Sequence, residues 1–277
     1  MMQSRRFYTI ITYVLLGLGA LIVVTPFLYM VSTSLKGQTY VFELPPRFIP
    51  SKVTFRNYTQ ALRTDDFGLY FLNSAIVAIF ATASTVLISS LLAYAFGRMQ
   101  FRGKRILFAT LLLGMMIPPV MLIIPQFMIA KEFHLLNSLA GLIVVYIAMN
   151  LSMQTYLLTG FFKTIPQDLI EAALIDGAGQ WRIFWKIILP LSGSGLAVTV
   201  IFTFLYSWDE FPWAHVAIKQ TSHRTLPIAI ALFQNQHLTE WGQVFAASII
   251  ALIPVVIVYI IFQRYFVAGI ATTGLKT

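Results

Sequence analysis

The sequence predicts an all-α membrane protein with six transmembrane helices. Of its 277 residues, 58% are hydrophobic and only 10% are charged, whereas soluble domains carry about 25% charged residues. So few charges argue against a soluble enzyme, and so many apolar residues argue against a disordered chain. The apolar residues form runs of about 20 or more, the length that a helix needs to cross the hydrocarbon core. Cysteine is absent, so the chain has no disulfides and no cysteine-ligated metal site.

Six apolar runs carry this prediction. In order, they are Phe7–Val31, Phe71–Phe96, Ile106–Ala130, Leu139–Phe162, Leu196–Ala217 and Val244–Phe266. They are longer than the strands of an outer-membrane barrel and do not alternate in polarity. Pro118, Pro119 and Pro125 interrupt the third run and Pro254 the sixth, which indicates either transport sites or kinks that improve packing. No linker divides the chain, so we expect one membrane domain over residues 1–277.

Lysine and arginine are concentrated in alternate loops. The loops after the second and fourth runs contain Arg98, Arg102, Lys104, Arg105, Lys163, Arg182 and Lys186, whereas those after the third and fifth contain Lys131, Lys219 and Arg224. Because cation-rich loops stay in the cytoplasm, we expect both termini to be cytoplasmic. The net charge of +9 is spread over membrane loops, which favours contact with the anionic lipid bilayer and not with nucleic acid.

The sequence has no motif for catalysis or cofactor binding. It contains no G-x-x-x-x-G-K-[ST] loop, so it predicts no ATP binding through a P-loop. Its four histidines form no H-E-x-x-H pair, so a zinc protease is not indicated. We therefore expect no catalytic residue, no metal and no cofactor in this chain.

The loop between the fourth and fifth runs, about residues 163–190, has the pattern of two short amphipathic helices. Thr164 and Gln167 have the spacing of a capping box, and Pro166 suits a first helical turn. Residues that recur at i, i+3, i+4 and i+7 share one helix face: Ile170, Ala173, Leu174 and Gly177. Gly177 also suits a left-handed residue at the helix C-terminus.

The second of these helices is expected to begin at about Gln180 and to stop at Pro190. Its spacing places four apolar residues on one face: Trp181, Phe184, Trp185 and Ile188. The apolar faces of both helices need a cover. Two readings stay open on periodicity alone: interfacial helices that rest on lipid headgroups, or a segment that docks into a soluble partner.

The same segment resembles a known family. Glu171-Ala172-Ala173, Asp176-Gly177-Ala178 and Ile187-x-Leu189-Pro190 are similar to the EAA loop of ATP-binding-cassette importer permeases. The resemblance covers nearly the whole chain and is closest to carbohydrate-uptake permeases of the maltose type. The supporting matches are Phe55-Arg-Asn57-Tyr58, Asn73-Ser74, Ala93-Tyr-Ala-Phe96-x-Arg98, Trp208-x-Glu210-Phe211, Thr225-Leu226-Pro227 and Trp241-Gly242.

The resemblance implies a type I importer permease with a cytoplasmic coupling helix from about Pro166 to Ala178. The ATPase-coupling residues that it implies are Glu171, Ala172, Ala173, Asp176, Gly177, Leu189 and Pro190. The implied partners are two cytoplasmic ATPase subunits that carry ATP and Mg, a second and different permease chain, and an extracytoplasmic solute-binding protein. The implied location is the cytoplasmic (inner) membrane of a bacterium or archaeon.

The function implied by this resemblance is uptake of a sugar, an oligosaccharide or a related polyol. One alternative is a permease of the same architecture for a non-sugar solute, because the EAA loop is shared with such importers. A less favoured alternative is an autonomous secondary carrier. Such a carrier should have coupling acids deep in the bundle and an internal repeat, and the sequence shows neither.

Five residues inside the apolar runs are candidates for a translocation path. Asp209 and Glu210 follow Trp208 in the outer third of the fifth run. A charge at the bilayer centre costs about 2.5–3.5 kcal/mol, so these acids must face a neighbour, a cavity or water. They are either hydrated acids at the interface or part of the pathway. Asn150 and Gln154 lie one turn apart in the fourth run and either form interhelical hydrogen bonds or line the pathway.

Overall fold

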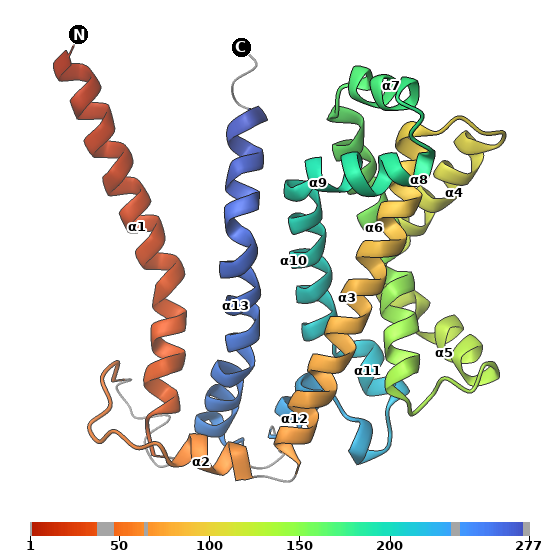
Figure 1. Cartoon of the computed structure of the whole chain (residues 1–277). Coiled ribbons are helices and arrows are strands. Elements are labelled where there is room, and N and C mark those ends of the chain that lie inside the picture. The colour runs from red at the N-terminus through yellow and green to blue at the C-terminus, as the bar shows by residue number, and fades with distance from the viewer. Residues whose placement is uncertain (1, 38–46, 64–65, 234–238, 274–277) are drawn as a thin grey trace. The chain divides into compact units, whose positions relative to one another are not determined.

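The structure is a computed structural model that describes residues 2–37, 47–63, 66–233 and 239–273. Every regular element in these ranges is a helix (Figure 1). The elements are α1 (Met2–Ser34), α2 (Arg56–Arg63), α3 (Phe67–Arg98), α4 (Lys104–Met116), η2 (Pro119–Leu122), α5 (Ile123–Glu132), α6 (Leu139–Thr164), α7 (Gln167–Ile175), α8 (Gln180–Ile183), η3 (Phe184–Ile188), α9 (Leu189–Leu191), α10 (Gly193–Asp209), α11 (Pro212–Ala217), η4 (Thr221–His223), α12 (Leu226–Leu232) and α13 (Trp241–Thr273).

The predicted all-α membrane fold is confirmed. Four helices in the described ranges are long and apolar enough to cross a membrane: Tyr8–Ser34, Phe67–Arg98, Leu139–Thr164 and Trp241–Tyr265. Two further pairs of helices pass the same test but are sharply bent, and they bring the total to six if each pair is one span. The four straight helices and the first bent pair overlap predicted runs, whereas the second bent pair, Gln180–Asp209, shares only Leu196–Asp209 with the fifth run, Leu196–Ala217.

The third apolar run is bent and not straight. Lys104–Met116 and Pro119–Glu132 meet at an angle of 97°. Ile117 is extended, with φ −93° and ψ 120°, because the residue before a proline is kept out of the helical region. Pro118 and Pro119 therefore break this run, as expected. Pro125, in the first turn of α5, and Pro254, inside α13, leave their helices continuous.

The fifth apolar run ends earlier than predicted. A continuous helix was expected over Leu196–Ala217, but α10 stops at Asp209 and α11 begins at Pro212. Glu210 between them is extended, with φ −67° and ψ 118°. Proline has no N–H to continue the backbone ladder and is suited to the first turn of a new helix. The acidic pair thus lies at a helix break.

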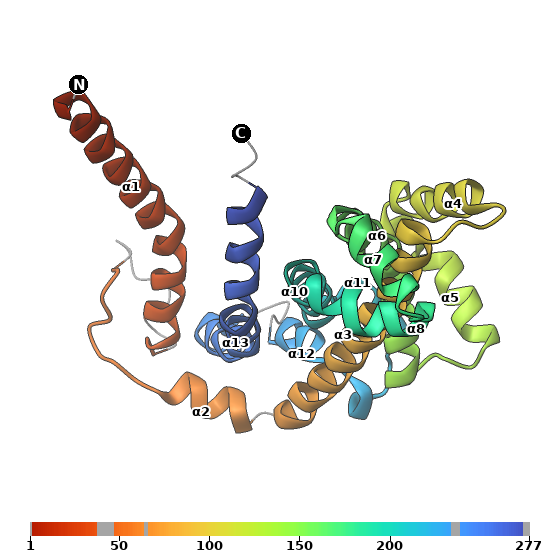
Figure 2. The same cartoon turned by 45° about the horizontal axis from the view of Figure 1, so that its top comes forward.

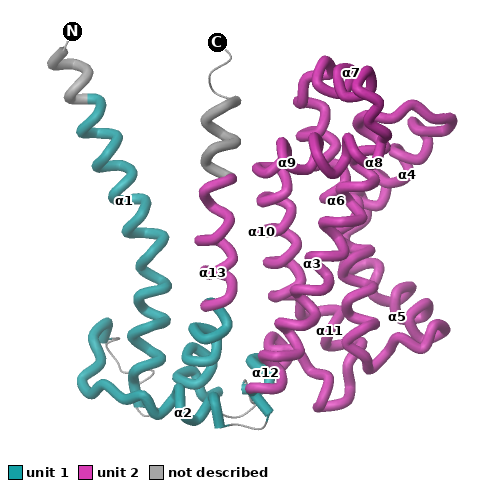
Figure 3. The backbone as a smooth tube through the Cα atoms, viewed as in Figure 1, with its two compact units in different colours: residues 1–67, 229–252 teal, residues 68–228, 253–277 magenta. Residues whose placement is uncertain are grey.

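The chain divides into two compact units, each described here by itself (Figure 3). The first comprises residues 1–67 and 229–252. In it, Asn57 Nδ2 donates hydrogen bonds to Ser34 O at 2.8 Å and Lys36 O at 2.6 Å, which satisfies carbonyls at the end of α1. A Cβ on Gly242 would lie 2.5 Å from Asn57 Nδ2. The Phe55-Arg-Asn57-Tyr58 and Trp241-Gly242 motifs, both part of the family resemblance, therefore pack against each other.

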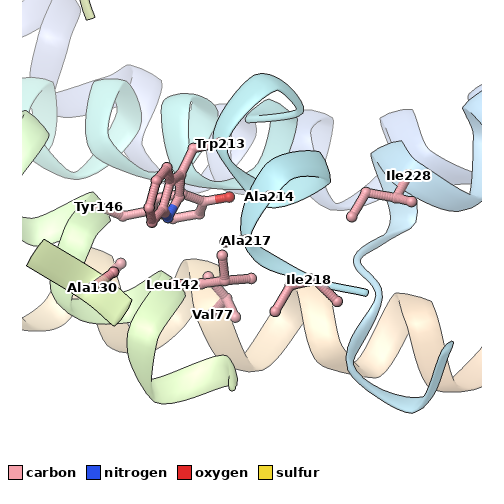
Figure 4. Close-up of a cluster of buried hydrophobic side chains, with 10 residues drawn as sticks. Val77, Ala130, Leu142, Tyr146, Trp213, Ala214, Ala217, Ile218 and Ile228 are labelled. Atoms are coloured by element: carbon pink, nitrogen blue, oxygen red, sulfur yellow. The ribbon is translucent and has the colours of Figure 1, made fainter. Parts of the chain in front are cut away.

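The second unit comprises residues 68–228 and 253–277. One of its buried clusters joins α3, α5, α6 and α11, and Figure 4 shows it. Its members include Val77, Ala130, Leu142, Tyr146, Trp213, Ala214, Ala217, Ile218 and Ile228. A second cluster joins α3, the end of α6, α7 and α8: Ala93, Tyr94, Leu158, Phe162, Ile165, Ile170, Ile183, Phe184 and Ile188. The first cluster holds α11 against α3 and α6, and the second holds α7 and α8 against α3 and the end of α6.

Candidate functional site

The EAA segment forms α7, a separate short helix beyond the end of α6 (Figures 1 and 2). The predicted capping box is wrong. Thr164 Oγ1 donates to Phe161 O at 2.8 Å and so closes α6, while α7 begins after Pro166 without a side-chain cap. Ile165 is extended, with φ −67° and ψ 132°, as expected before a proline. Pro166 therefore separates the two helices.

The C-terminus of α7 has the predicted glycine geometry. Gly177 has φ +76°, in the left-handed region that glycine occupies without strain. Its N–H bonds to Leu174 O at 3.0 Å, and the N–H of Ala178 reaches back to Ala173 O at 2.9 Å. This pair of hydrogen bonds satisfies carbonyls that would otherwise be unpaired at the helix end. Asp176 is the C-cap residue and is exposed.

One side of α7 is covered by residues of its own chain. Ile170 is only 6% exposed and belongs to the second buried cluster, and Ala173 packs against that cluster. These two residues attach α7 to its own chain. Of the four residues that helical spacing groups together, Ile170 and Ala173 are thus covered within the chain, whereas Leu174 and Gly177 are exposed. The exposed surface of α7 comprises Asp168, Leu169, Glu171, Ala172, Leu174 and Ile175.

Arg98, the last residue of α3, ties this loop to two long helices. Its Nε donates to Phe162 O at 2.9 Å, its Nη2 donates to Phe162 O and Ile165 O, and its Nη1 donates to Gln167 Oε1 at 3.0 Å. A cation is favourable at the carbonyl end of α6. One turn earlier on α3, Tyr94 donates from its hydroxyl to Gln180 Oε1 at 2.6 Å. The motif that ends in Arg98 thus holds both short helices.

The second short helix begins at Gln180, as predicted, but its apolar residues do not share one face. Phe184 and Ile188 are buried, whereas Trp181 is 67% exposed and Trp185 is 52% exposed. Residues Phe184–Ile188 form a π-helical segment, whose wider hydrogen-bond spacing changes the facing of successive residues. The helix also continues past Pro190 to Leu191. Leu189 is half-buried against the second cluster, and Pro190 is exposed.

A cleft of about 750 Å³ lies elsewhere in the same unit, between η2, α6, α10 and α11. It brings together four of the five residues that the sequence nominates for a translocation path: Asn150, Gln154, Asp209 and Glu210. Trp208 does not line it. Its indole is buried, lies edge-on to Phe71 at 5.4 Å between ring centroids, and stacks on Phe204 at 5.7 Å.

The two acids in this cleft have different surroundings. Asp209 is exposed, whereas Glu210 is only 8% exposed. Glu210 accepts hydrogen bonds from the hydroxyl of Tyr146 at 2.7 Å and from the backbone N–H groups of Trp213 at 2.7 Å and Ala214 at 3.0 Å. The carboxylate therefore caps the first turn of α11. The buried acid, Glu210, is thus fully hydrogen-bonded, as the cost of an isolated charge in the membrane requires.

The neutral polar groups in the cleft are only partly satisfied. Asn150 Nδ2 donates to Tyr146 O at 2.9 Å, within its own helix. Gln154 is 2% exposed, and its Oε1 has no hydrogen-bond partner in the described structure. The indole Nε1 of Trp213, a second lining residue, is also unpaired there. Buried polar atoms are normally paired, so these two atoms in the wall of the cleft are exceptions.

Sequence reasoning missed the aromatic residues of this cleft. Tyr146, Asn150 and Gln154 follow one another at intervals of four on α6, so extending the helical period backward by one turn would have placed Tyr146 beside them. No comparable signal connects Trp213 to α6, because their contact depends on the helix break at Glu210.

The Asn73-Ser74 and Thr225-Leu226-Pro227 motifs meet each other and have a structural role. Asn73 Nδ2 donates to Ser222 O and to Arg224 O, both at 2.9 Å. Ser74 Oγ accepts from the N–H of Leu226 at 2.8 Å, at the start of α12. Within the described residues no group of three histidine, aspartate or glutamate side chains could hold a metal ion.

Comparison with known proteins agrees with this architecture. The chain is 34% identical over 274 residues to the diacetylchitobiose uptake system permease of Streptomyces coelicolor, covering 98% of this chain and 90% of the relative. It is 37% identical over 268 residues to the trehalose/maltose transport system permease of Thermococcus litoralis, covering 94% of each.

A solved structure resembles nearly the whole chain. It belongs to a bacterial ABC transporter involved in the import of the acidic polysaccharide alginate, with a TM-score of 0.80, 25% identity, and coverage of 95% of this chain and 98% of the other. Residues 86–272 match the model of the family described as "Binding-protein-dependent transport system inner membrane component". The chain therefore belongs to the family of inner membrane components of binding-protein-dependent transport systems.

Proposed function

We propose that this chain is a permease subunit of an importer for a sugar, an oligosaccharide or a related polyol. The observation that carries this proposal is α7, an EAA-type helix presented at one end of a membrane bundle with an exposed apolar ridge. The relatives support the solute class, because their names specify diacetylchitobiose and trehalose or maltose. The cleft has mainly apolar walls with a few polar lining residues, as ligand sites commonly have.

In this proposal, α7 is the coupling helix. The exposed residues Glu171, Ala172 and Asp176, together with the apolar Leu169, Leu174 and Ile175, contact an ATPase subunit. Ala173 and Leu189 anchor the loop from within, Gly177 shapes the turn after α7, and Pro190 lies exposed in the last turn before the bend at Ser192. Movement of the ATPase subunit passes to the bundle through Arg98, because its guanidinium bonds both to Gln167 of α7 and to the end of α6.

The cleft is proposed as this chain's share of the translocation path. Asn150, Gln154, Asp209 and Glu210 line it, and a second, different permease chain faces it to complete the pore. Trp208 does not line the cleft. Its indole packs on Phe71 of α3 and on Phe204 of α10 and so helps to hold the two helices together. The most apolar window of α1 has no buried residue within the described structure, so its surface is left for lipid or for the second permease chain.

Two cytoplasmic ATPase subunits carry ATP and Mg in this proposal, and an extracytoplasmic solute-binding protein delivers the solute. The chain lies in a bacterial or archaeal cytoplasmic membrane with both termini in the cytoplasm, consistent with its cation-rich loops. Because native cysteine is absent, a cysteine introduced at Gly103 should react with an impermeant thiol reagent only from the cytoplasmic side.

Purification of the tagged full-length chain from its native membrane tests the proposal. We expect a second permease, two ATPase subunits and, after incubation, a solute-binding protein to copurify. Cells that lack the chain should lose uptake of one of three radiolabelled probes: trehalose, maltose or diacetylchitobiose. Copurification with normal uptake of all three would exclude these three sugars as the only solutes, and competition with other sugars and with non-sugar solutes would then identify the class. Transport by the chain alone, without ATPase subunits, would support a secondary carrier and overturn the proposal.

A further inference from the structure

The helix that follows the coupling loop lies across the bundle. Gln180–Leu191, which comprises α8, η3 and α9, makes an angle of 79° with α10. Figure 1 shows α8 and α9 lying across the upper ends of α3 and α10. Because α3 and α10 belong to the membrane bundle, a helix nearly perpendicular to α10 runs close to the membrane plane. Helices in this position commonly rest in the interface between headgroups and acyl chains.

The exposed surface of this helix has two adjacent stripes of different chemistry. Trp181 and Trp185 are four residues apart and are 67% and 52% exposed. Arg182 and Lys186 have the same spacing and are also exposed. Within the described residues neither cation forms an ion pair. Tryptophan is enriched at membrane interfaces, and basic side chains beside an apolar stripe are typical of helices that bind anionic lipid.

A cavity of about 300 Å³ opens next to the tryptophan stripe. Leu91, Met99, Trp181 and Phe184 form its apolar walls, and Tyr94 and Gln180, bonded to each other, supply its polar edge. Its size is at the lower end of the range for small-ligand sites. Lys104 Nζ donates to the carbonyl of Met99 at 2.7 Å, which places a third cation at the rim.

We propose that this surface binds an anionic phospholipid. Arg182 and Lys186 hold the headgroup phosphate, the indoles of Trp181 and Trp185 lie at the glycerol level, and the start of one acyl chain enters the cavity. The π-helical segment supports a binding role, because such segments occur frequently at functional sites. The proposed site is separate from the coupling surface of α7 and from the translocation cleft, so it does not depend on which solute is carried.

Tryptophan quenching by brominated lipid tests the proposal. The full-length chain is placed in nanodiscs of phosphatidylcholine with increasing fractions of brominated phosphatidylglycerol or, in parallel, brominated phosphatidylcholine. The measured quantity is the lipid fraction that gives half of the maximal quenching. We expect the brominated phosphatidylglycerol to reach this point at a several-fold lower fraction. The double variant Trp181→Phe/Trp185→Phe should lose the larger part of the quenching, because Trp208 and Trp213 are buried and Trp241 is half-buried.

The cations are tested with Arg182→Gln/Lys186→Gln, which changes only exposed side chains. Each basic residue near an anionic surface contributes about 1 kcal/mol, or about fivefold in affinity. Because the variant removes two such residues, it should lose the several-fold preference for phosphatidylglycerol entirely. The control Lys131→Gln/Lys219→Gln removes the same charge from exposed positions outside the proposed site and should keep the preference. Equal quenching by both brominated lipids in the unmodified chain, or quenching that disappears when the ATPase subunits bind, would overturn the proposal.

Discussion

The hydroxyl of Tyr146 on α6 donates a 2.7 Å hydrogen bond to the carboxylate of Glu210, at the break between α10 and α11. The same carboxylate accepts two backbone N–H groups at the start of α11. Glu210 is thus a buried connection between two helices as well as a lining residue of the cleft. A hydrogen bond to a charged group contributes about 1.5–3 kcal/mol.

We expect Glu210→Ala to lower the stability of the purified permease, because it removes the cap of α11 and leaves the hydroxyl of Tyr146 unpaired. Tyr146→Phe removes a single hydrogen bond and should cost less, about 1.5–3 kcal/mol. The measurement is the midpoint of thermal unfolding in detergent, followed by size-exclusion chromatography. A Glu210→Ala protein with unchanged midpoint and lost uptake would instead assign Glu210 to gating.

Gln154→Leu should separate a pathway role from a packing role. The Oε1 atom of Gln154 is buried without a partner in the described structure, so replacing the amide with an apolar group of similar size should not lower stability. We expect normal abundance in the membrane and reduced uptake of the sugar probe. Reduced stability with proportionally reduced uptake would contradict a role of Gln154 in the path.

Asp209→Asn should leave both folding and sugar uptake close to normal. Asp209 is exposed in the cleft, and asparagine keeps its size and most of its hydrogen-bonding capacity. Uptake is compared at equal membrane abundance, with the unmodified chain as the reference. A strong loss of uptake under these conditions would show that the negative charge itself is needed in the pathway.

Ile175→Ser should weaken attachment of the ATPase subunits without disturbing the loop. Ile175 is 87% exposed on α7, so the free permease loses no buried contact when it is shortened. Ile170 is buried on the opposite side, and Ile170→Ser is the matched variant, which should destabilise the loop. The measurement is the amount of ATPase subunit that copurifies with each variant. Equal retention by Ile175→Ser and the unmodified chain would argue against the proposed contact surface.

Gly177→Asp should abolish uptake in a protein that is still inserted. Gly177 has φ +76°, and a side chain in that conformation costs about 1 kcal/mol or more. Gly103 in a different loop has φ +80°, and neither glycine has a neighbouring atom within 4 Å of the position a Cβ would occupy. Gly103→Asp therefore carries the same local strain away from α7.

We expect only Gly177→Asp to release the ATPase subunits and to uncouple ATP hydrolysis from the solute-binding protein. Membrane abundance, subunit copurification and uptake are measured for both variants. If the Gly103→Asp variant lost as much uptake, the loss in both variants would be due to backbone strain and not to the position of Gly177 next to α7. Normal uptake with retained ATPase subunits in the Gly177→Asp variant would show that the turn at Gly177 is not needed for coupling.

The sequence alone predicted the properties that depend on residues close together in the chain. The apolar runs predicted the helices and their location in the membrane, because the number of consecutive apolar residues determines whether a helix is long enough to cross the bilayer. The break at Pro118 and Pro119 and the left-handed Gly177 followed from local backbone sterics. The EAA pattern indicated the family, which the comparisons confirm. Pro125 and Pro254 show the limit of this reasoning, since their helices continue.

Only the tertiary structure decided which side of each short helix is covered. Ile170 turns inward because Tyr94, Phe162 and Ile165 form a cluster under α7, and Arg98 binds the loop from a distance of 69 residues in sequence. Likewise, the partners that distinguish buried Glu210 from exposed Asp209 include Tyr146, 64 residues away. Helical periodicity specifies which residues share a face, but the contacts that cover a face come from segments distant in the chain, and folding alone brings them together.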